Sequence, residues 1–201
     1  MRMILLRRHR KNFPLRQRVR AAQGFFAEII GIVFILLPVL ASAEGIGTGV
    51  KAPFFRVKSG AGEEVTPDST RGRVIAIVYE TKDVVEKSRN LKRELNRCYD
   101  ELSFDLRKSI LRLPVINCSS AFWPITEIWK SKLRENSAKE GLTLYGDWEG
   151  SMFSKYKMKD NETNVVIIDK KGIIRYVEQG KFGDDEIYRI KSLLTELIYG
   201  I

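Results

Sequence analysis

Apolar and polar positions in the middle of the chain follow the pattern of a strand and then that of a helix. Residues 74–79, VIAIVY, are continuously apolar and rich in β-branched side chains, which predicts a strand covered on both faces. Apolar residues then recur at helical spacing, at Val84, Leu91, Leu95, Cys98 and Leu102. Asp83, followed three residues later by Glu86, has the spacing of a capping box and predicts that this helix begins there.

The rest of the chain alternates strands and helices in the same way. Short strands are predicted at residues 54–57, 113–117 and 142–145. A helix is predicted from Pro124 towards Gly141, and two further strands are joined by a turn at residues 169–172. An amphipathic helix capped by Asp184 or Asp185 follows. This order predicts an α/β fold with a central mixed β-sheet flanked by helices on both faces.

The first 43 residues have the pattern of a secretory signal peptide. A long basic stretch precedes an apolar run at residues 29–41, and the small residues Ala41-Ser42-Ala43 predict cleavage after Ala43. The alternative is an uncleaved membrane anchor, because residues 24–27 extend the apolar run towards the ~20 residues that a membrane helix needs. In both cases the basic flank places the rest of the chain outside the cytoplasm, periplasmic or secreted, with the membrane reached only through this segment.

The N-terminal segment also holds much of the positive charge. It contains eight of the 35 basic residues and one of the 25 acidic residues, so the formal charge of +10 falls to +3 for the remainder. That remainder has no basic tract with interleaved aromatic residues, and nucleic-acid binding is not expected. His9, the only histidine, lies in the same segment, which excludes a Ser-His-Asp or Cys-His mechanism and a histidine-containing zinc site in the exported part.

Several stretches of the sequence resemble a known group of proteins. GVKAPFFRV, at residues 49–57, resembles the opening of redoxins, the thioredoxin-fold group that includes peroxiredoxins and thiol-disulfide oxidoreductases, and VVIIDKKGIIRY resembles their late hairpin. Within that group GRVIAIVYETKDVVEKSRNL and the stretch from NVVIIDKKG into the last helix are most similar to the periplasmic YtfJ-like proteins. The resemblance implies a thioredoxin-like domain over residues 49–201.

The redox site that this resemblance would bring is missing at two places. Active thioredoxin-like enzymes carry a CxxC pair where the first central strand meets its helix, and here that place is held by Thr81, Lys82 and Asp83. A peroxidatic cysteine is absent from this helix start as well. The proline that precedes the hairpin strand in these enzymes is also missing, since ETN stands at residues 162–164. The sequence therefore predicts a thioredoxin fold without dithiol chemistry.

The two cysteines, Cys98 and Cys118, are the remaining candidates for thiol chemistry. Cys98 follows the apolar stripe of its helix and is expected to be a buried hydrophobic residue. Cys118 is expected beyond the carboxyl end of its strand, where open α/β sheets place their sites, either as a thiol of lowered pKa or as a structural residue. A helix from Asp83 to Cys98 would rise on the order of 20 Å, which argues against a disulfide between the cysteines.

Clusters of aromatic and of acidic residues give weaker signals. The aromatic residues are expected mainly in the core, with an exposed partner surface as the alternative: Phe122, Trp123, Trp129 and Trp148. The acidic residues could gather round a cation but lack the spacing of a calcium loop: Asp147, Glu149, Asp160 and Glu162. No metal and no cofactor is therefore predicted.

These observations predict an extracytoplasmic thioredoxin-fold protein that acts as a non-catalytic binding or accessory protein, with a protein as one kind of partner. The alternative is an enzyme, a thiol-disulfide oxidoreductase or a peroxiredoxin-like antioxidant protein, that uses Cys118 alone, with a partner thiol or disulfide resolving it. The two hypotheses differ in one measurable property, the reactivity of the Cys118 thiol.

Overall fold

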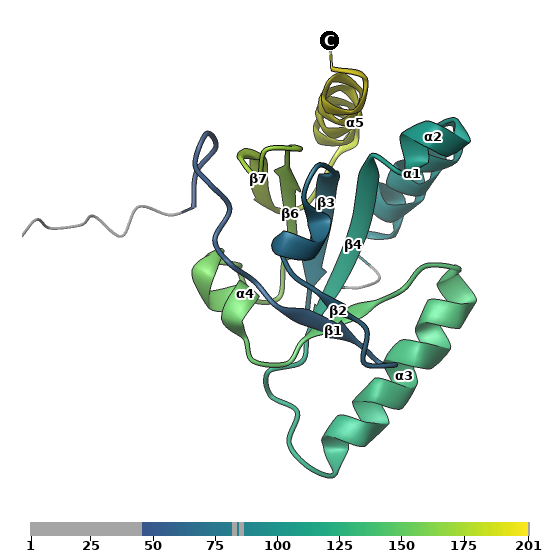
Figure 1. Cartoon of the computed structure of the whole chain (residues 1–201). Helices are drawn as coiled ribbons and strands as arrows, with labels where there is room; N and C mark the ends of the chain where they lie inside the picture. The colour runs from purple at the N-terminus through teal and green to yellow at the C-terminus, as the bar shows by residue number, and fades with distance from the viewer. Residues whose placement is uncertain (1–45, 82–83, 85–86, 201) are drawn as a thin grey trace, which may run out of the picture. The chain divides into compact units, whose positions relative to one another are not determined.

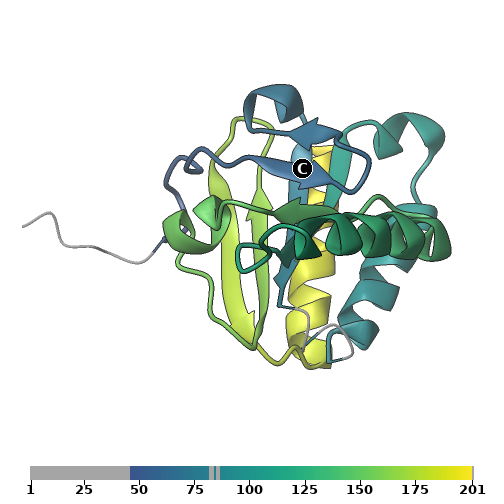
Figure 2. The same ribbon diagram turned by 90° about the horizontal axis from the view of Figure 1, so that it is seen from below.

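The computed structural model describes residues 46–81, 84 and 87–200. The expected signal segment, with Ala41 and Ala43, and the junction residues Lys82 and Asp83 lie outside the described residues. The described chain has a seven-stranded mixed sheet flanked by helices (Figure 1, Figure 2). Within this part of the chain, no helix is both long enough and apolar enough to cross a membrane.

The sheet has the strand order β2-β1-β5-β4-β3-β6-β7. Its strands are β1 (Val57–Ser59), β2 (Glu64–Val65), β3 (Val74–Glu80), β4 (Ile110–Asn117), β5 (Tyr145–Asp147), β6 (Thr163–Ile168) and β7 (Ile174–Gly180). The helices are η1 (Asp68–Thr70), α1 (Arg89–Asp100), α2 (Phe104–Arg107), α3 (Ile125–Glu140), α4 (Ser151–Lys155) and α5 (Asp184–Tyr199).

Strand β3 lies at the centre of the sheet, and all seven of its residues are buried. It pairs in parallel with β4, from Val74 opposite Ile110 to Glu80 opposite Ile116, and antiparallel with β6. Burial on both faces explains the uninterrupted apolar sequence of β3 and confirms the predicted strand.

Different helices cover the two faces of the sheet. On one face, α1 and α5 pack against β3 and β6 through residues such as Leu91, Leu95 and Ile190. On the other face, α4 and the chain before β1 cover the sheet through Met152 and Phe55. Figure 1 shows α4 on one side of the strands and α1 and α5 on the other. This arrangement confirms the predicted mixed sheet with helices on both faces.

Helix α1 begins later than the sequence predicts. Its first residue is Arg89, and Ser88 is its N-cap residue. Val84, which is only 1% exposed, lies in a turn that packs into the core instead of in the helix. The predicted start at Asp83 is therefore wrong, because capping-box spacing is a local preference that tertiary packing can outweigh.

The strand that follows α3 begins at Tyr145 and not at residue 142. Gly141 has a φ of 59°, and the N–H groups of Leu142 and Leu144 donate to the carbonyl and the hydroxyl of Ser137 at 3.2 and 2.9 Å. Since these donors close the end of the helix, residues 142–144 do not pair as a strand.

Three other predicted boundaries can be compared with the structure. The helix predicted from Pro124 is confirmed, with Pro124 as the N-cap residue of α3. The predicted hairpin is confirmed as β6 and β7, and Gly172 in its turn has a φ of 81°. The first strand begins at Val57 and not at residue 54.

The last helix, α5, is capped by a residue other than the predicted aspartates. Its N-cap residue is Gly183, whose N–H donates to Glu186 Oε2 at 3.0 Å. Asp184 and Asp185 lie instead in the first turn, where their negative charge faces the positive end of the helix dipole.

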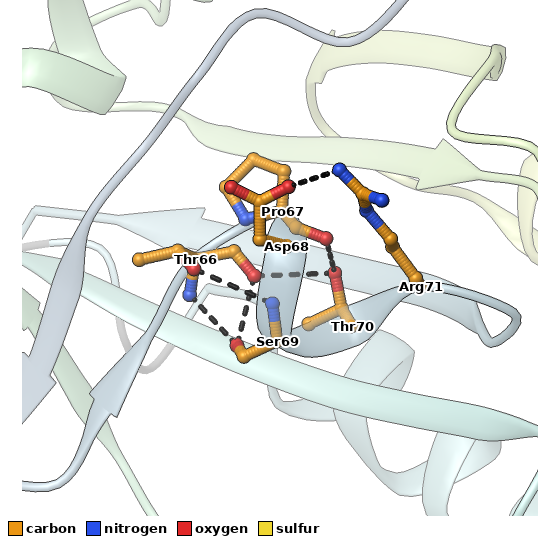
Figure 3. A network of polar contacts seen from close by, with 6 residues as sticks. All are labelled: Thr66, Pro67, Asp68, Ser69, Thr70 and Arg71. Atoms are coloured by element: carbon orange, nitrogen blue, oxygen red, sulfur yellow. Dashed lines mark hydrogen bonds and ion pairs between the residues drawn. The ribbon is translucent and has the colours of Figure 1, made fainter.

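Short polar contacts hold the turn that leads into β3. The Thr66 N–H donates to the Ser69 hydroxyl at 3.0 Å, and that hydroxyl donates back to the Thr66 carbonyl at 2.9 Å (Figure 3). Arg71 donates to Asp68 at 2.7 Å across η1. This turn-rich stretch is thus ordered mainly by local hydrogen bonds.

Candidate functional site

The carboxyl ends of β3, β4 and β5 meet at one edge of the sheet. Glu80 ends β3 and Thr81 follows it, while Asn117 at the end of β4 lies opposite Asp147 at the end of β5. Cys118 follows β4 at the same edge, where the sequence places it. In open α/β sheets this edge is where ligands bind.

Cys118 is completely buried at this edge. Its N–H donates to the Asp147 carbonyl at 3.2 Å, and its Sγ lies 3.0 Å from the position that a Cβ on Gly146 would occupy. Burial, and secondarily the charge of Asp147, raises the pKa of the thiol to about 12. A nucleophilic thiol needs an exposed position and a lowered pKa, so these surroundings favour a structural role for Cys118.

The Asp147 carboxylate is turned into the protein. Its Oδ2 accepts hydrogen bonds from the Tyr79 hydroxyl at 3.2 Å and from the Phe153 N–H at 2.9 Å. Burial raises the pKa of Asp147 despite these bonds, and burial together with the neighbouring carboxylate raises the pKa of Tyr79. Asp147 therefore joins β5, β3 and α4 inside the core. Among the residues that the structure describes, no three His, Cys, Asp or Glu side chains are grouped as a metal site would require.

A buried carboxylate lies next to the place where the redox motif would stand. Glu80 is 3% exposed and Thr81 is 8% exposed. The Lys92 ammonium group, on α1, donates to Glu80 Oε2 at 3.2 Å. Burial raises the pKa of Glu80, and the hydrogen bonds and positive charge around it offset part of that shift. The junction thus holds a buried threonine and a buried acid that is paired with Lys92, and it presents no thiol among the described residues.

Asn164 takes part in a closed set of hydrogen bonds near the start of β6. Its amide nitrogen donates to the carbonyls of Tyr79, Lys159 and Glu162 at 3.3, 3.0 and 3.0 Å. Its amide oxygen accepts from the Lys159 N–H at 2.7 Å. Asn164 is 1% exposed, so the strand end that would carry a proline in a redox enzyme is instead closed by a side-chain amide.

Cys98 is partly exposed, which corrects the expectation that it is buried in the core. Burial still raises its pKa, so Cys98 offers no activated thiol. Both cysteines are free, in agreement with the argument against a disulfide.

The four aromatic residues separate into two pairs. Phe122 and Trp123, in the loop before α3, are 65% and 81% exposed, so the expectation of core positions is wrong for both. Trp129 and Trp148 are half-buried, and the Trp148 indole N–H donates to the Lys58 carbonyl at 3.0 Å. The loop lies outside the periodic elements, where apolar character alone does not reveal burial.

A cavity of about 630 Å³ lies between α1, α3 and one face of β4. Its walls are mainly apolar and include Leu95, Leu102, Ile116, Trp129, Leu133 and Leu144. Cys98 and Cys118 also reach its lining.

One cluster of polar side chains in the cavity lining is centred on Arg112. The Arg112 guanidinium donates to Asn96 Oδ1 at 2.8 Å and stacks over the Tyr99 ring at 3.8 Å. Sequence reasoning missed these three residues. The one available signal was a charged residue within an otherwise apolar strand, ILRLPVIN.

By sequence, no protein-family model and no curated protein matches this chain. By structure, it is similar to the thioredoxin domain of a thiol-disulfide oxidoreductase from Bacteroides vulgatus, with a TM-score of 0.55, 17% identity, and coverage of 75% of this chain and 99% of that one. The fold is thioredoxin-like.

Two further thioredoxin-like structures agree with this result. A thiol peroxidase from Chromobacterium violaceum has a TM-score of 0.56 and 15% identity, and covers 76% of this chain and 88% of its own. An exposed lipoprotein thioredoxin from Streptococcus pneumoniae has a TM-score of 0.54 and 13% identity, with coverages of 70% and 99%. At such identities the similarity establishes the thioredoxin-like fold alone.

Proposed function

We propose that this chain is an extracytoplasmic thioredoxin-fold protein that binds a partner or ligand and does not catalyse thiol-disulfide exchange, as the resemblance to YtfJ-like periplasmic proteins suggests. The observation that carries the proposal is the burial of Cys118, whose pKa is raised to about 12. Thr81 supports it, because a buried threonine begins the junction where this fold usually presents its reactive thiols.

The raised pKa has a large effect on reactivity. At pH 8, a thiol with a pKa of about 12 is ionised in roughly one molecule in 10,000, against roughly one in four for an ordinary thiol of pKa ~8.5. A more basic thiolate is more nucleophilic, which recovers roughly 40-fold of this difference at a Brønsted slope of about 0.45. We therefore expect Cys118 to react roughly 60-fold more slowly than an ordinary thiol, and burial to slow it further.

The alternative function is a thiol-disulfide oxidoreductase or peroxiredoxin-like enzyme that uses Cys118. The name of one structural neighbour, a thiol peroxidase, is compatible with it. This alternative requires Cys118 to leave the core and a partner thiol to resolve the product. Cys98 does not supply an activated second thiol, because its pKa is also raised by burial.

Alkylation of single-cysteine variants tests the proposal. Cys98→Ser leaves Cys118 as the single cysteine, and Cys118→Ser leaves Cys98. Each purified protein is treated with iodoacetamide between pH 6 and 10, either folded or in urea. The labelled residue is then identified by mass spectrometry. We expect Cys118 to be labelled only in urea, and the folded protein neither to reduce insulin disulfides nor to consume hydrogen peroxide. Turnover that Cys118→Ser abolishes and Cys98→Ser preserves would establish the enzyme instead.

Export is tested separately from chemistry. Cells expressing the full chain are fractionated, and the N-terminus of the purified protein is determined by mass spectrometry. We expect extracytoplasmic protein that begins at Glu44, whereas retention of residues 29–43 would identify a membrane anchor. Protein confined to the cytoplasm would contradict the extracytoplasmic part of the proposal.

A further inference from the structure

We propose that the cavity between α1, α3 and β4 binds a single-chain amphiphile with an anionic head, of the fatty-acid carboxylate class. The inference deepens the proposed binding function by naming a ligand class, and it rests on that function. It concerns α1, α3 and β4 and requires no thiol chemistry. Binding and thiol turnover are therefore measured independently.

The size and walls of the cavity suit an apolar chain. Its volume of about 630 Å³ falls within the ~300–1,000 Å³ that is typical of small-molecule sites. Ile116, Trp129 and Leu144 lie on its walls and remain partly exposed. An alkyl chain that covers these side chains removes apolar surface from water, which is the main favourable contribution to such binding.

Arg112 supplies the position for an anionic head. It is partly buried on β4, its partners are Asn96 and the Tyr99 ring, and within the described residues no acidic side chain pairs with it. A guanidinium has five N–H donors in a planar fork that matches a carboxylate. Arg107 lies over the same Tyr99 ring at 5.4 Å, which adds positive charge near this end of the cavity.

The other charged groups that line the cavity leave Arg112 without a neutralising partner. Glu80 is bonded to Lys92 at 3.2 Å. Lys132 adds a further positive charge, and Glu140, in the last turn of α3, is the remaining acid among the lining residues that the structure describes. The described lining residues thus carry a net charge of +1, which favours an anionic head over a cationic one.

Calorimetric titration of the purified protein below the critical micelle concentration tests the inference with three probes. Sodium dodecanoate is expected to bind saturably, one molecule per chain. Decanoate, which has two methylene groups fewer, is expected to bind roughly 15-fold more weakly. Dodecyltrimethylammonium, which has the same chain with a cationic head, is expected to bind at least about tenfold more weakly than dodecanoate.

Variants assign the binding to the cavity. Arg112→Gln is expected to weaken dodecanoate binding about tenfold. The same variant is expected to bind dodecyltrimethylammonium at least as tightly as the wild type, which also shows that it folds. Arg112→Lys, which keeps the charge but lacks the planar fork, is expected to bind dodecanoate with an affinity between those of the wild type and Arg112→Gln. Ile116→Trp, which fills the floor of the cavity, is expected to abolish binding of both probes. Trp123→Ser, at an exposed residue outside the cavity lining, is the matched control and is expected to change nothing.

Three results would overturn the inference: no saturable binding of dodecanoate, equal affinity for both head groups, or affinity that Trp123→Ser lowers while Arg112→Gln does not. Each of these would refute the amphiphile site while the alkylation result for Cys118 stood unchanged. Turnover through Cys118 would refute the non-catalytic function even where dodecanoate binds.

Discussion

Replacing Gly60 by alanine would test how α3 is held against the rest of the domain. Gly60 follows β1 and is buried, and a Cβ there would collide with the main-chain carbonyl of Lys130 and lie 3.0 Å from the main-chain nitrogen of Arg134. Because both atoms belong to the backbone of α3, the helix itself has to move. Arg134 Nη1 also donates to the Gly60 carbonyl at 2.6 Å, so the displacement strains this bond as well.

We expect Gly60→Ala to lower the free energy of unfolding by about 1.5–4.5 kcal/mol. Forcing an extra methyl into a close contact costs about 1–3 kcal/mol, and weakening the partly buried hydrogen bond from Arg134 adds about 0.5–1.5 kcal/mol. Leu133 is the buried residue of α3 and is 6% exposed. If α3 left the sheet entirely, uncovering Leu133 would add about 1.5–3 kcal/mol to this loss.

Urea unfolding followed by tryptophan fluorescence and circular dichroism measures this loss. Ala61→Ser, at the exposed neighbouring position, is the control and should change stability by less than about 0.5 kcal/mol. Arg134→Lys keeps the charge but removes the guanidinium bond, so its effect, about 0.5–1 kcal/mol, separates the hydrogen bond from the collision. A Gly60→Ala protein as stable as the Ala61→Ser protein would refute the close approach of α3 to this turn.

Two other positions give predictions of the same kind. Asn164→Leu should destabilise the protein by about 2–4 kcal/mol, because the N–H of Lys159 and three carbonyls lose their hydrogen-bond partner. Glu178→Gln, at an exposed position of β7, is the control, and equal urea midpoints for the two variants would contradict the network. Burial raises the pKa of Glu80 in the folded state, so the folded protein holds this proton more tightly than the unfolded chain does. The contribution of Glu80 to stability therefore falls as the pH rises from the unfolded pKa of about 4.3 through the raised folded value. Glu80→Gln removes that titration. In urea unfolding curves from pH 4 to 8, the stability of the variant minus that of the wild type should increase with pH. A difference that stays constant or decreases would show that the pKa of Glu80 is not raised in the folded state.

The centre of the fold could be predicted because its residues carry the signal of burial on both faces. β3 is apolar at every position except its last, and the hairpin at Gly172 needs a positive φ that glycine adopts freely. Element boundaries depended on contacts that short patterns do not contain. The start of α1 is shifted by the packing of Val84, and the start of β5 is shifted by hydrogen bonds to Ser137.

Only those features of the candidate site that follow from residue types and element order could be predicted. The absence of cysteine before α1 and the position of Cys118 after β4 follow from residue types and element order. The burial of Cys118 could not be predicted, because it depends on the packing of Gly146 and Asp147 from a different strand. Arg112 shows the same limit, since the spacing of α1 and α3 decides whether its guanidinium faces a packed interior or a cavity.

The energetics of the cavity indicate that its contents matter to the protein. The cavity is open to solvent, and Ile116, Trp129 and Leu144 on its walls are partly exposed. In solution the space therefore has to be filled by solvent or by a ligand. Water against Leu133, Trp129 and Ile116 gains few hydrogen bonds, whereas an alkyl chain replaces that contact favourably and a carboxylate can bond to Arg112. Helix α3, whose close approach to the turn after β1 depends on Gly60, forms one wall of the cavity. Gly60→Ala should therefore weaken dodecanoate binding as well as lower stability, while Ala61→Ser should preserve both.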